Sequence, residues 1–500
     1  MPHITEDSVQ IKKESDSMYK EMLLMTKEMA CVYFVQNETY QLNWHDNWLL
    51  TPVRKRKRSM PSYEVFLGGS CNPTTWRKDI VIPVLSKHNI SFYNPQVDDW
   101  NPTLVKFEAS AKQDAKLLLF VIDDTTRNCA GIVEASALAA SRTQQTVLVL
   151  KYHQRGQTIN GEVISDREHY ELVNAMAILE YLYANRNGDP TYSIEMGLQK
   201  VIWKLRGDTG IEDVPDPQAH LHKIDLNAPE HDFTAMNAAF GDLRINEANY
   251  KIDAKKAFLK LMEVIGIPQV DLQNPRDDEM KVLDETYALR RFASVFMNKS
   301  IKEKLSYEQI FAFTSYWLRW IRKDAVRSLR DDWMDNIFDT TSNRDLYLGF
   351  FQTENDYWHN NDASIKLVEA RGFSFYRPCT DEFNSLIMPL EYLRMEKSAV
   401  VVLEIPQDQR ALATMAVVAH LIELVKPVVI SFQNISMSTS SLANGEKLTE
   451  TARKDYNRGR AYLMDMIQDK AKTTAKANVF LCTNVEEALG KAISLVKEDF

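Results

Sequence analysis

The chain has few cysteines and no long apolar run. Its 500 residues include five cysteines, at positions 31, 71, 129, 379 and 482, which are far apart and form no C-x-x-C pair. Neither a disulfide framework nor a zinc site is predicted from this spacing. The polar N-terminus lacks the apolar region of a signal peptide, and no stretch offers about 18 uncharged apolar residues. We therefore expect a cytoplasmic or nuclear protein with no membrane attachment, no metal and no cofactor.

An excess of positive charge is also lacking. The formal net charge is -9 and the sequence pI is about 5.7, which argues against general nucleic-acid binding. The exception is a run of five basic residues, Arg54, Lys55, Arg56, Lys57 and Arg58. This run is a solvated linker, a nuclear import signal or a phosphate-facing patch.

A regular α/β pattern begins at Tyr63. Largely uncharged strand patterns at 64–67, 90–93, 116–122 and 146–150 alternate with helical patterns after Pro73, from about 103 and over 129–141. Ser165 and Glu168 form a capping box for a further helix, and Ser193 precedes another. This alternation predicts a parallel sheet covered by helices on both faces.

The second half of the chain repeats the first. Residues 90–95 (ISFYNP) match 373–378 (FSFYRP), and at the same offset of 283 residues the stretch 115–122 (AKLLLFVI) falls on 398–405 (SAVVVLEI). Between the copies, amphipathic helices with two similar loops have the outline of a paired EF-hand. These loops lack the alternating carboxylates and the glycine of a calcium loop, so a metal-free structural module is predicted, with weak calcium binding as the alternative.

Polar side chains gather just after the predicted strands, where open parallel sheets bind ligands. The first strand is followed by a small-residue turn that lets backbone N–H groups approach a phosphate or sugar. Two adjacent acids follow the second strand, and two more follow the third. The predicted ligand-binding residues are Gly68, Gly69, Ser70, Asn72, Asn94, Trp100, Asp123, Asp124 and Asn128.

Three acids are candidates for chemistry at this edge. Two carboxyl groups can cleave a bond between a base and deoxyribose, one capturing the sugar carbon and one protonating the departing base. Glu134 lies near a helix N-terminus, whose dipole favours the ionised form of a nucleophile. Asp98 or Asp99, beside Trp100, would retain a proton as the acid. The alternative is that these acids only cap loops and helices.

Three stretches, FLGGSCNPTTWRKDIVIPVL, FYNPQVDDWNP and AGIVEASALA, resemble the nucleoside 2-deoxyribosyltransferase superfamily over about residues 63–150. The resemblance implies a flavodoxin-like fold, a catalytic Glu that forms a covalent deoxyribosyl intermediate, and an Asp that assists base departure. On matching positions these are Glu134, with Asp98 and Asp99 on the base side, and Gly68 and Gly69 face the sugar or its phosphate. Asn128 and Ala130 stand where such transferases often have Asp and Gly.

We therefore expect an α/β protein with two flavodoxin-like, doubly wound parallel-sheet domains separated by an all-α, degenerate EF-hand-like module. The expected boundaries are 1–62 for an N-terminal extension, 63–207 for the first domain, 208–340 for the helical module and 341–500 for the second domain. Because this superfamily often completes its site with a neighbouring subunit, a homodimer is a further expectation.

The second copy has lost most of the acidic positions. Pro406 and Gln407 stand where Asp123 and Asp124 stand in the first, and the helix over 411–422 has no carboxylate. We expect no catalysis there. The tandem arrangement also resembles the animal Raw-like proteins, which implies a role in developmental and stress-kinase signalling.

Two functions follow from these patterns. One is a regulatory or scaffold protein of intracellular signalling that has signalling proteins as partners and binds a deoxynucleoside or deoxynucleotide at the first domain. The other is an active nucleoside or nucleotide N-glycosidase or 2-deoxyribosyltransferase that uses Glu134 as nucleophile.

Overall fold

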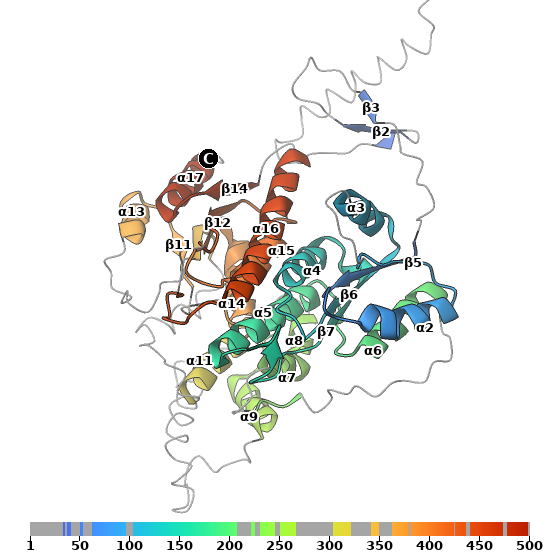
Figure 1. Cartoon of the computed structure of the whole chain (residues 1–500). Coiled ribbons are helices and arrows are strands. Elements are labelled where there is room, and N and C mark those ends of the chain that lie inside the picture. Colours follow the sequence, from blue (N-terminus) through green and yellow to red (C-terminus); the bar gives the residue numbers. More distant parts are fainter. Residues whose placement is uncertain are drawn as a thin grey trace, which may run out of the picture. The chain divides into compact units, whose positions relative to one another are not determined.

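The computed structural model divides the chain into two compact units, Met1–Pro61 and Ser62–Phe500 (Figure 1). In the first unit the described residues form an antiparallel sheet of β1 (Phe34–Val35), β2 (Glu38–Gln41) and β3 (Thr51–Val53). In the second unit the described residues are 63–96, 104–207, 222–225, 231–245, 251–266, 304–321, 342–349, 363–378, 380, 382–424, 426–436, 441–473 and 478–498. The basic run 54–58 and the predicted site residues Asp98, Asp99 and Trp100 lie outside the described residues.

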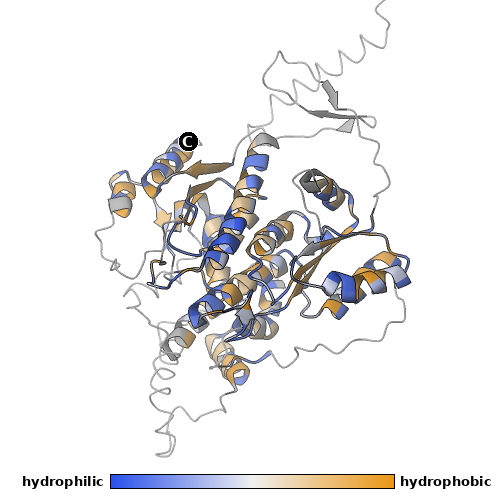
Figure 2. Cartoon of the chain, in the orientation of Figure 1, coloured by the Kyte–Doolittle hydropathy of each residue, from blue (hydrophilic) through white to orange (hydrophobic). Residues whose placement is uncertain are grey.

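The first α/β region, residues 63–207, contains a parallel sheet with the order β5-β4-β6-β7. Its strands are β4 (Val65–Gly69), β5 (Phe92–Tyr93), β6 (Leu117–Ile122) and β7 (Thr146–Leu150). All six residues of β6 are buried, and Figure 2 shows hydrophobic colouring along these central strands. Alternate β6 side chains enter two different cores, as expected for a sheet covered on both faces.

Helices cover both faces of this sheet. One core contains α4 (Cys129–Ser141) and α5 (Asp166–Ala184), and the other contains α2 (Ile82–Lys87) and α6 (Ile194–Arg206) together with the π-helical turn η1 (Arg77–Val81). The smaller elements are α3 (Leu104–Asp114), η2 (Thr143–Gln145), β8 (Thr158–Ile159) and β9 (Glu162–Val163). The predicted caps form, because the Ser165 hydroxyl accepts from the backbone N–H of Glu168 at 3.0 Å and Ser193 does the same for Met196 at 3.2 Å.

The second α/β region, residues 342–498, contains a parallel sheet with the order β11-β10-β12-β13-β14. Its strands are β10 (Arg344–Gly349), β11 (Phe375–Tyr376), β12 (Ser398–Ile405), β13 (Val428–Phe432) and β14 (Val479–Cys482). Its helices are α13 (Ala363–Ala370), α14 (Met388–Lys397), α15 (Leu412–Leu421), α16 (Glu450–Thr473) and α17 (Val485–Glu498). The first four strands have the same spatial order as in the first region, and both orders are typical of flavodoxin-like folds.

Local details recur at equivalent positions. The backbone N–H of Glu64 donates to the Ser91 hydroxyl at 3.0 Å, and that of Asp345 donates to the Ser374 hydroxyl at 3.1 Å. Asn128 and Ala411, 283 residues apart, both adopt the left-handed conformation (φ 43° and 51°) immediately before α4 and α15. Such agreement in a strained backbone position supports the repeat detected in the sequence.

Helices predominate between the two α/β regions. The described ones are α7 (Asp232–Phe240), α8 (Asp242–Ile245), α9 (Ala254–Ile265) and α11 (Tyr307–Ile321). Ile252 and Leu305 exchange two backbone hydrogen bonds of 2.9 and 2.8 Å and so join the two loops that precede α9 and α11. The Phe233 ring packs edge-on against Tyr181 of α5, with centroids 5.7 Å apart, which anchors α7 on the first α/β region.

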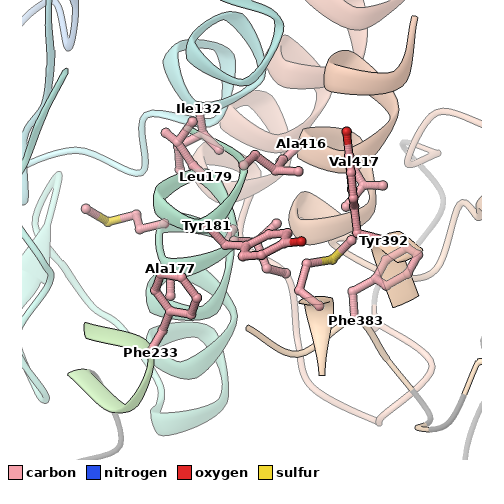
Figure 3. Packing of buried hydrophobic residues seen from close by; sticks show 14 of the residues in the cluster. Ile132, Ala177, Leu179, Tyr181, Phe233, Phe383, Tyr392, Ala416 and Val417 are labelled. Carbon is pink, nitrogen blue, oxygen red and sulfur yellow. The ribbon is translucent and has the colours of Figure 1, made fainter. Parts of the chain in front are cut away.

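Helices α4, α5, α15 and α16 lie between the two sheets (Figure 1). Helix α4 packs on α15 and α16, and α15 packs on α4 and α5. Figure 3 shows Ile132, Leu179, Ala416 and Val417 at this junction, with Tyr181 nearby. All of these side chains belong to one buried cluster that continues into both α/β regions.

Candidate functional site

A pocket lies beyond the carboxyl ends of the first-region strands, against the N-terminus of α4 and the side of α16. Its volume is about 110 Å³, where a single water molecule needs roughly 10–15 Å³ on the same measure. The first region supplies most of the wall and the second region supplies the rest. Its lining includes Gly68, Gly69, Cys71, Asn72, Glu108, Arg127, Asn128 and Glu134 from the first region, and Asp455, Arg458 and Tyr462 from α16.

The glycine pair at the end of β4 is required by close packing. A Cβ at Gly68 would lie 2.1 Å from the Phe120 ring, and one at Gly69 would lie 2.0 Å from the Val121 carbonyl oxygen. Gly69 also has φ +94°, a conformation that favours glycine. The strand end therefore approaches β6 closely, and both glycines belong to β4 where the sequence predicted a turn. Both also line the pocket, and their contact with a phosphate or sugar stays a prediction.

Two buried polar side chains hold this turn in place. The Arg77 guanidinium donates to the carbonyl oxygens of Leu67 (3.1 Å) and Ser70 (2.5 Å), and burial lowers the pKa of Arg77. The Ser70 hydroxyl accepts from the backbone N–H of Asp123 and from Asn128 Nδ2, both at 2.7 Å. Ser70 is only 1% exposed and lies beneath the pocket, so its observed contacts are structural.

Glu134 shares the pocket with a second glutamate that the sequence patterns did not single out. Lys112 of α3 forms an ion pair with Glu134, and its ammonium nitrogen lies 3.9 Å from Glu108 Oε1. Burial raises the pKa of Glu108; Lys112 opposes this effect and the neighbouring Glu134 adds to it. One lysine thus faces two carboxyl groups, and burial raises the pKa of one of them, Glu108.

Residues 62–153 match the family model described as "Nucleoside 2-deoxyribosyltransferase like". This match confirms the resemblance expected from the glycine turn and the Glu134 helix, and it includes Glu108 as well. No curated protein and no solved structure gave a significant match to the chain. We call residues 62–153 the deoxyribosyltransferase-like region.

Of the remaining predicted ligand-binding residues of the deoxyribosyltransferase-like region, some line the pocket and others lie outside it. Asp123 and Asp124 pair with Lys151 at 3.2 and 2.9 Å and do not line the pocket. Asn72 lines the pocket, and its Oδ1 accepts a 2.6 Å hydrogen bond from Gln96. Asn94 accepts from the backbone N–H of Gln96 at 3.0 Å, outside the pocket lining.

Asn128, which the resemblance places where such transferases often have an Asp, lines the pocket next to Gly131. A Cβ at Gly131 would lie 2.3 Å from Asn128 Oδ1. Gly131, one position later than the superfamily glycine, therefore leaves room for the Asn128 side chain beside the pocket.

An ion-pair cluster at the base of the pocket ties α16 to the deoxyribosyltransferase-like region. Arg127 is 2% exposed and contacts Glu168 at 2.6 Å, Glu162 at 3.0 Å and Asp455 of α16 at 3.3 Å. The Tyr456 hydroxyl of α16 donates to Glu168 Oε1 at 2.9 Å. Gly459 permits close approach, since a Cβ there would lie 3.0 Å from the Cβ of Cys129 at the start of α4.

The corresponding strand end of the second α/β region is occupied by protein. The buried Arg460 guanidinium donates to the carbonyl oxygens of Pro406 (3.1 Å), Gln409 (2.7 Å) and Arg410 (3.2 Å). Pro406 is the residue that stands where Asp123 stands in the first copy. The acidic pair Asp123 and Asp124 therefore has no counterpart at the equivalent positions 406 and 407.

The described residues contain neither a membrane-spanning helix nor a metal-binding cluster. None of the described helices is both long and apolar enough to cross a membrane. Within the same residues, no group of three or more His, Cys, Asp or Glu side chains is arranged to hold a metal ion.

Proposed function

We propose that the deoxyribosyltransferase-like region binds a 2-deoxynucleoside or 2-deoxynucleotide and cleaves the bond between its base and its sugar. The observation that carries the proposal is the placement of Glu134 and Glu108 in one pocket at the strand ends, with Lys112 of α3 in contact with both carboxyl groups. Two carboxyl groups that line one pocket suit the nucleophile and acid of glycosidic cleavage.

In the proposed reaction the Glu134 carboxylate attacks C1′ of the deoxyribose. The bond from C1′ to the base nitrogen breaks, its electron pair leaves with the base, and the base takes a proton from an acid. Glu108 is the described candidate for that acid, because it lines the same pocket as Glu134 and burial raises its pKa. Asp98 and Asp99 remain predicted candidates. Water then attacks C1′, gives its proton to the acid and releases the free sugar and Glu134.

Base release by the full-length chain tests this proposal. Deoxynucleosides and their 5′-monophosphates are incubated with the protein, and free base is measured by chromatography. We expect Glu134→Gln to abolish release and Glu108→Gln to lower it by about 100-fold. Glu195→Gln, at an exposed acid of α6 outside the pocket, should retain the wild-type rate. Base release that survives Glu134→Gln would rule out the nucleophile assignment.

A second candidate is a regulatory or scaffold protein of intracellular signalling with a Raw-like arrangement. It is favoured by the protein-filled strand end of the second region and by Asn128 in place of an Asp. In that case the pocket binds a deoxynucleotide without turnover, and signalling proteins bind elsewhere. Ligand-induced thermal stabilisation without any base release would support this candidate.

We also propose the finer organisation expected from the sequence, with tandem flavodoxin-like domains at 63–207 and 341–500 and a metal-free EF-hand-like module at 208–340. The common strand order and the bridge between Ile252 and Leu305 support it. Heat released on calcium titration would contradict the metal-free module. Nuclear import through Arg54 to Arg58 and a homodimer stay predictions, tested by localisation of a variant without those charges and by sedimentation.

A further inference from the structure

Helices α5 and α16 occupy equivalent positions in the two α/β regions. Each follows the fourth strand and begins with a hydroxyl cap, Ser165 for α5 and Thr449 for α16. These caps are 284 residues apart. Helix α5 packs on α15 of the other region, and α16 packs on α4. The two regions therefore meet in an approximately reciprocal way within one chain.

Ion pairs follow the same reciprocity. Arg127 precedes α4 in the first region and Arg410 precedes α15 in the second. Each arginine pairs with a glutamate that precedes the long helix of its own region, α5 or α16. Each also pairs across the junction with an acid on the long helix of the other region. The pairs are Arg127–Glu162 (3.0 Å) with Arg410–Glu446 (2.9 Å), and Arg127–Asp455 (3.3 Å) with Arg410–Glu171 (3.2 Å). All equivalent residues are 283 or 284 positions apart.

The two regions differ where α5 and α16 face the strand ends of the other region. Asn174 of α5 donates to the Phe383 carbonyl oxygen at 2.6 Å and accepts from the backbone N–H of Ser385 at 3.0 Å, so the second region's own chain fills that place. The equivalent residue of α16 is Arg458, which is exposed and lines the first-region pocket. Arg458 forms no hydrogen bond or ion pair with any other residue that the structure describes.

Arg458 is well placed to bind a ligand. Its neighbour Gly459 lies against α4, and Asp455, one turn earlier, is fixed by Arg127. A guanidinium held on a packed helix presents a planar set of donors that matches the oxygens of a phosphate. The first region itself offers Lys112 and Arg127, but both are already paired with carboxylates.

We propose that Arg458, supplied by the second α/β region, binds the 5′-phosphate of the ligand and makes the first-region pocket select deoxynucleoside 5′-monophosphates over deoxynucleosides. This inference rests on the proposed binding function of the deoxyribosyltransferase-like region. It gives the second region a role without catalysis, because its helix α16 completes the pocket of the first. Arg458 is a specificity-determining residue in this arrangement.

Calorimetric titration of the full-length chain tests the inference. The probes are the four common deoxynucleosides, their 5′-monophosphates and inorganic phosphate. For the wild type we expect at least one monophosphate to bind about tenfold or more tightly than its nucleoside. Arg458→Gln should remove this preference and leave nucleoside affinity unchanged, and Arg458→Lys should restore part of it. Lys454→Gln, at an exposed residue of the same helix outside the pocket, should keep the full preference.

The outcomes separate this inference from the proposed function. If the wild type binds nucleosides but shows no preference for monophosphates, or if Arg458→Gln keeps the preference, the role of Arg458 is overturned while the pocket stands. If no nucleoside or nucleotide binds the wild type, both proposals fail. Competition by inorganic phosphate that is lost in Arg458→Gln would support the phosphate contact directly.

Discussion

The buried charge of Arg127 is important for the stability of the fold. Its guanidinium faces three carboxylates, and two of the contacts, to Glu168 and Glu162, lie within its own α/β region. Removing one partner of a buried ion pair leaves uncompensated charge and typically costs 3–5 kcal/mol. We expect Arg127→Gln to lower the free energy of unfolding by about that amount in urea titrations. Lys454→Gln, which breaks an exposed pair with Glu450, should leave the urea midpoint unchanged, and equal effects of the two substitutions would contradict the assignment.

Single residues also mark the limit of what the sequence could predict. Gly68 and Gly69 are predictable site residues because they follow the predicted strand 64–67, at the edge where parallel sheets bind ligands. Ser70 belongs to the same turn, but its hydroxyl points into the protein, a direction that composition does not encode. Glu108 and Arg458 were missed, because each is a charged residue in an ordinary helical pattern and enters the site only through tertiary packing. For Arg458 a signal exists in the common spacing of the two long helices.

At the scale of elements, strands were the most predictable part. Uncharged runs such as 117–122 and 400–403 have apolar side chains on both sides of the strand, so both sheet faces must be buried. Both runs form central strands. The approach of α16 to α4 could not be predicted in the same way. The close approach depends on Gly459, although glycine in a helix interior normally disfavours the helix. It also depends on the contact of Asp455 with Arg127, which lies 328 residues earlier.

Strand β12 carries a prediction about pH. Burial raises the pKa of Glu404 to about 7 from 4.5, and Asp408 adds to the shift. The folded chain therefore binds this proton more tightly than the unfolded chain, and stability contributed by the group falls as pH rises from about 4.5 to 7.

We expect Glu404→Gln to raise the free energy of unfolding at pH 8 by roughly 1–3 kcal/mol and to change it little at pH 5, as measured by urea unfolding at both values. Glu195→Gln, an exposed acid, serves as the control. A gain of the same size at pH 5 and pH 8 would show that the carboxyl does not titrate in this range.

The largest apolar core of the described part of Ser62–Phe500 is shared by both α/β regions. A single cluster of buried side chains includes Phe66 of β4, Phe233 of α7, Tyr392 of α14 and Val479 of β14, so strands of both sheets and the helices between them are covered by the same core. When either region unfolds, it exposes apolar surface of the other region as well, because the two share this junction. The face that α4 and α5 present is already covered by α15 and α16 of the same chain.

Unfolding of both α/β regions should therefore be one cooperative event. We expect far-UV circular dichroism and tryptophan fluorescence to report coincident urea transitions. Ala416, which is fully buried at the junction of α15 with α4, provides the probe: Ala416→Asp buries an unpaired carboxylate and should shift both transitions together by roughly 2–5 kcal/mol. If the two signals instead separate in the wild type, or if Ala416→Asp moves only one of them, the α/β regions fold independently. In that case only the local contacts of Arg127, Tyr456 and Gly459 would keep α16 of the second region in place as a wall of the first-region pocket.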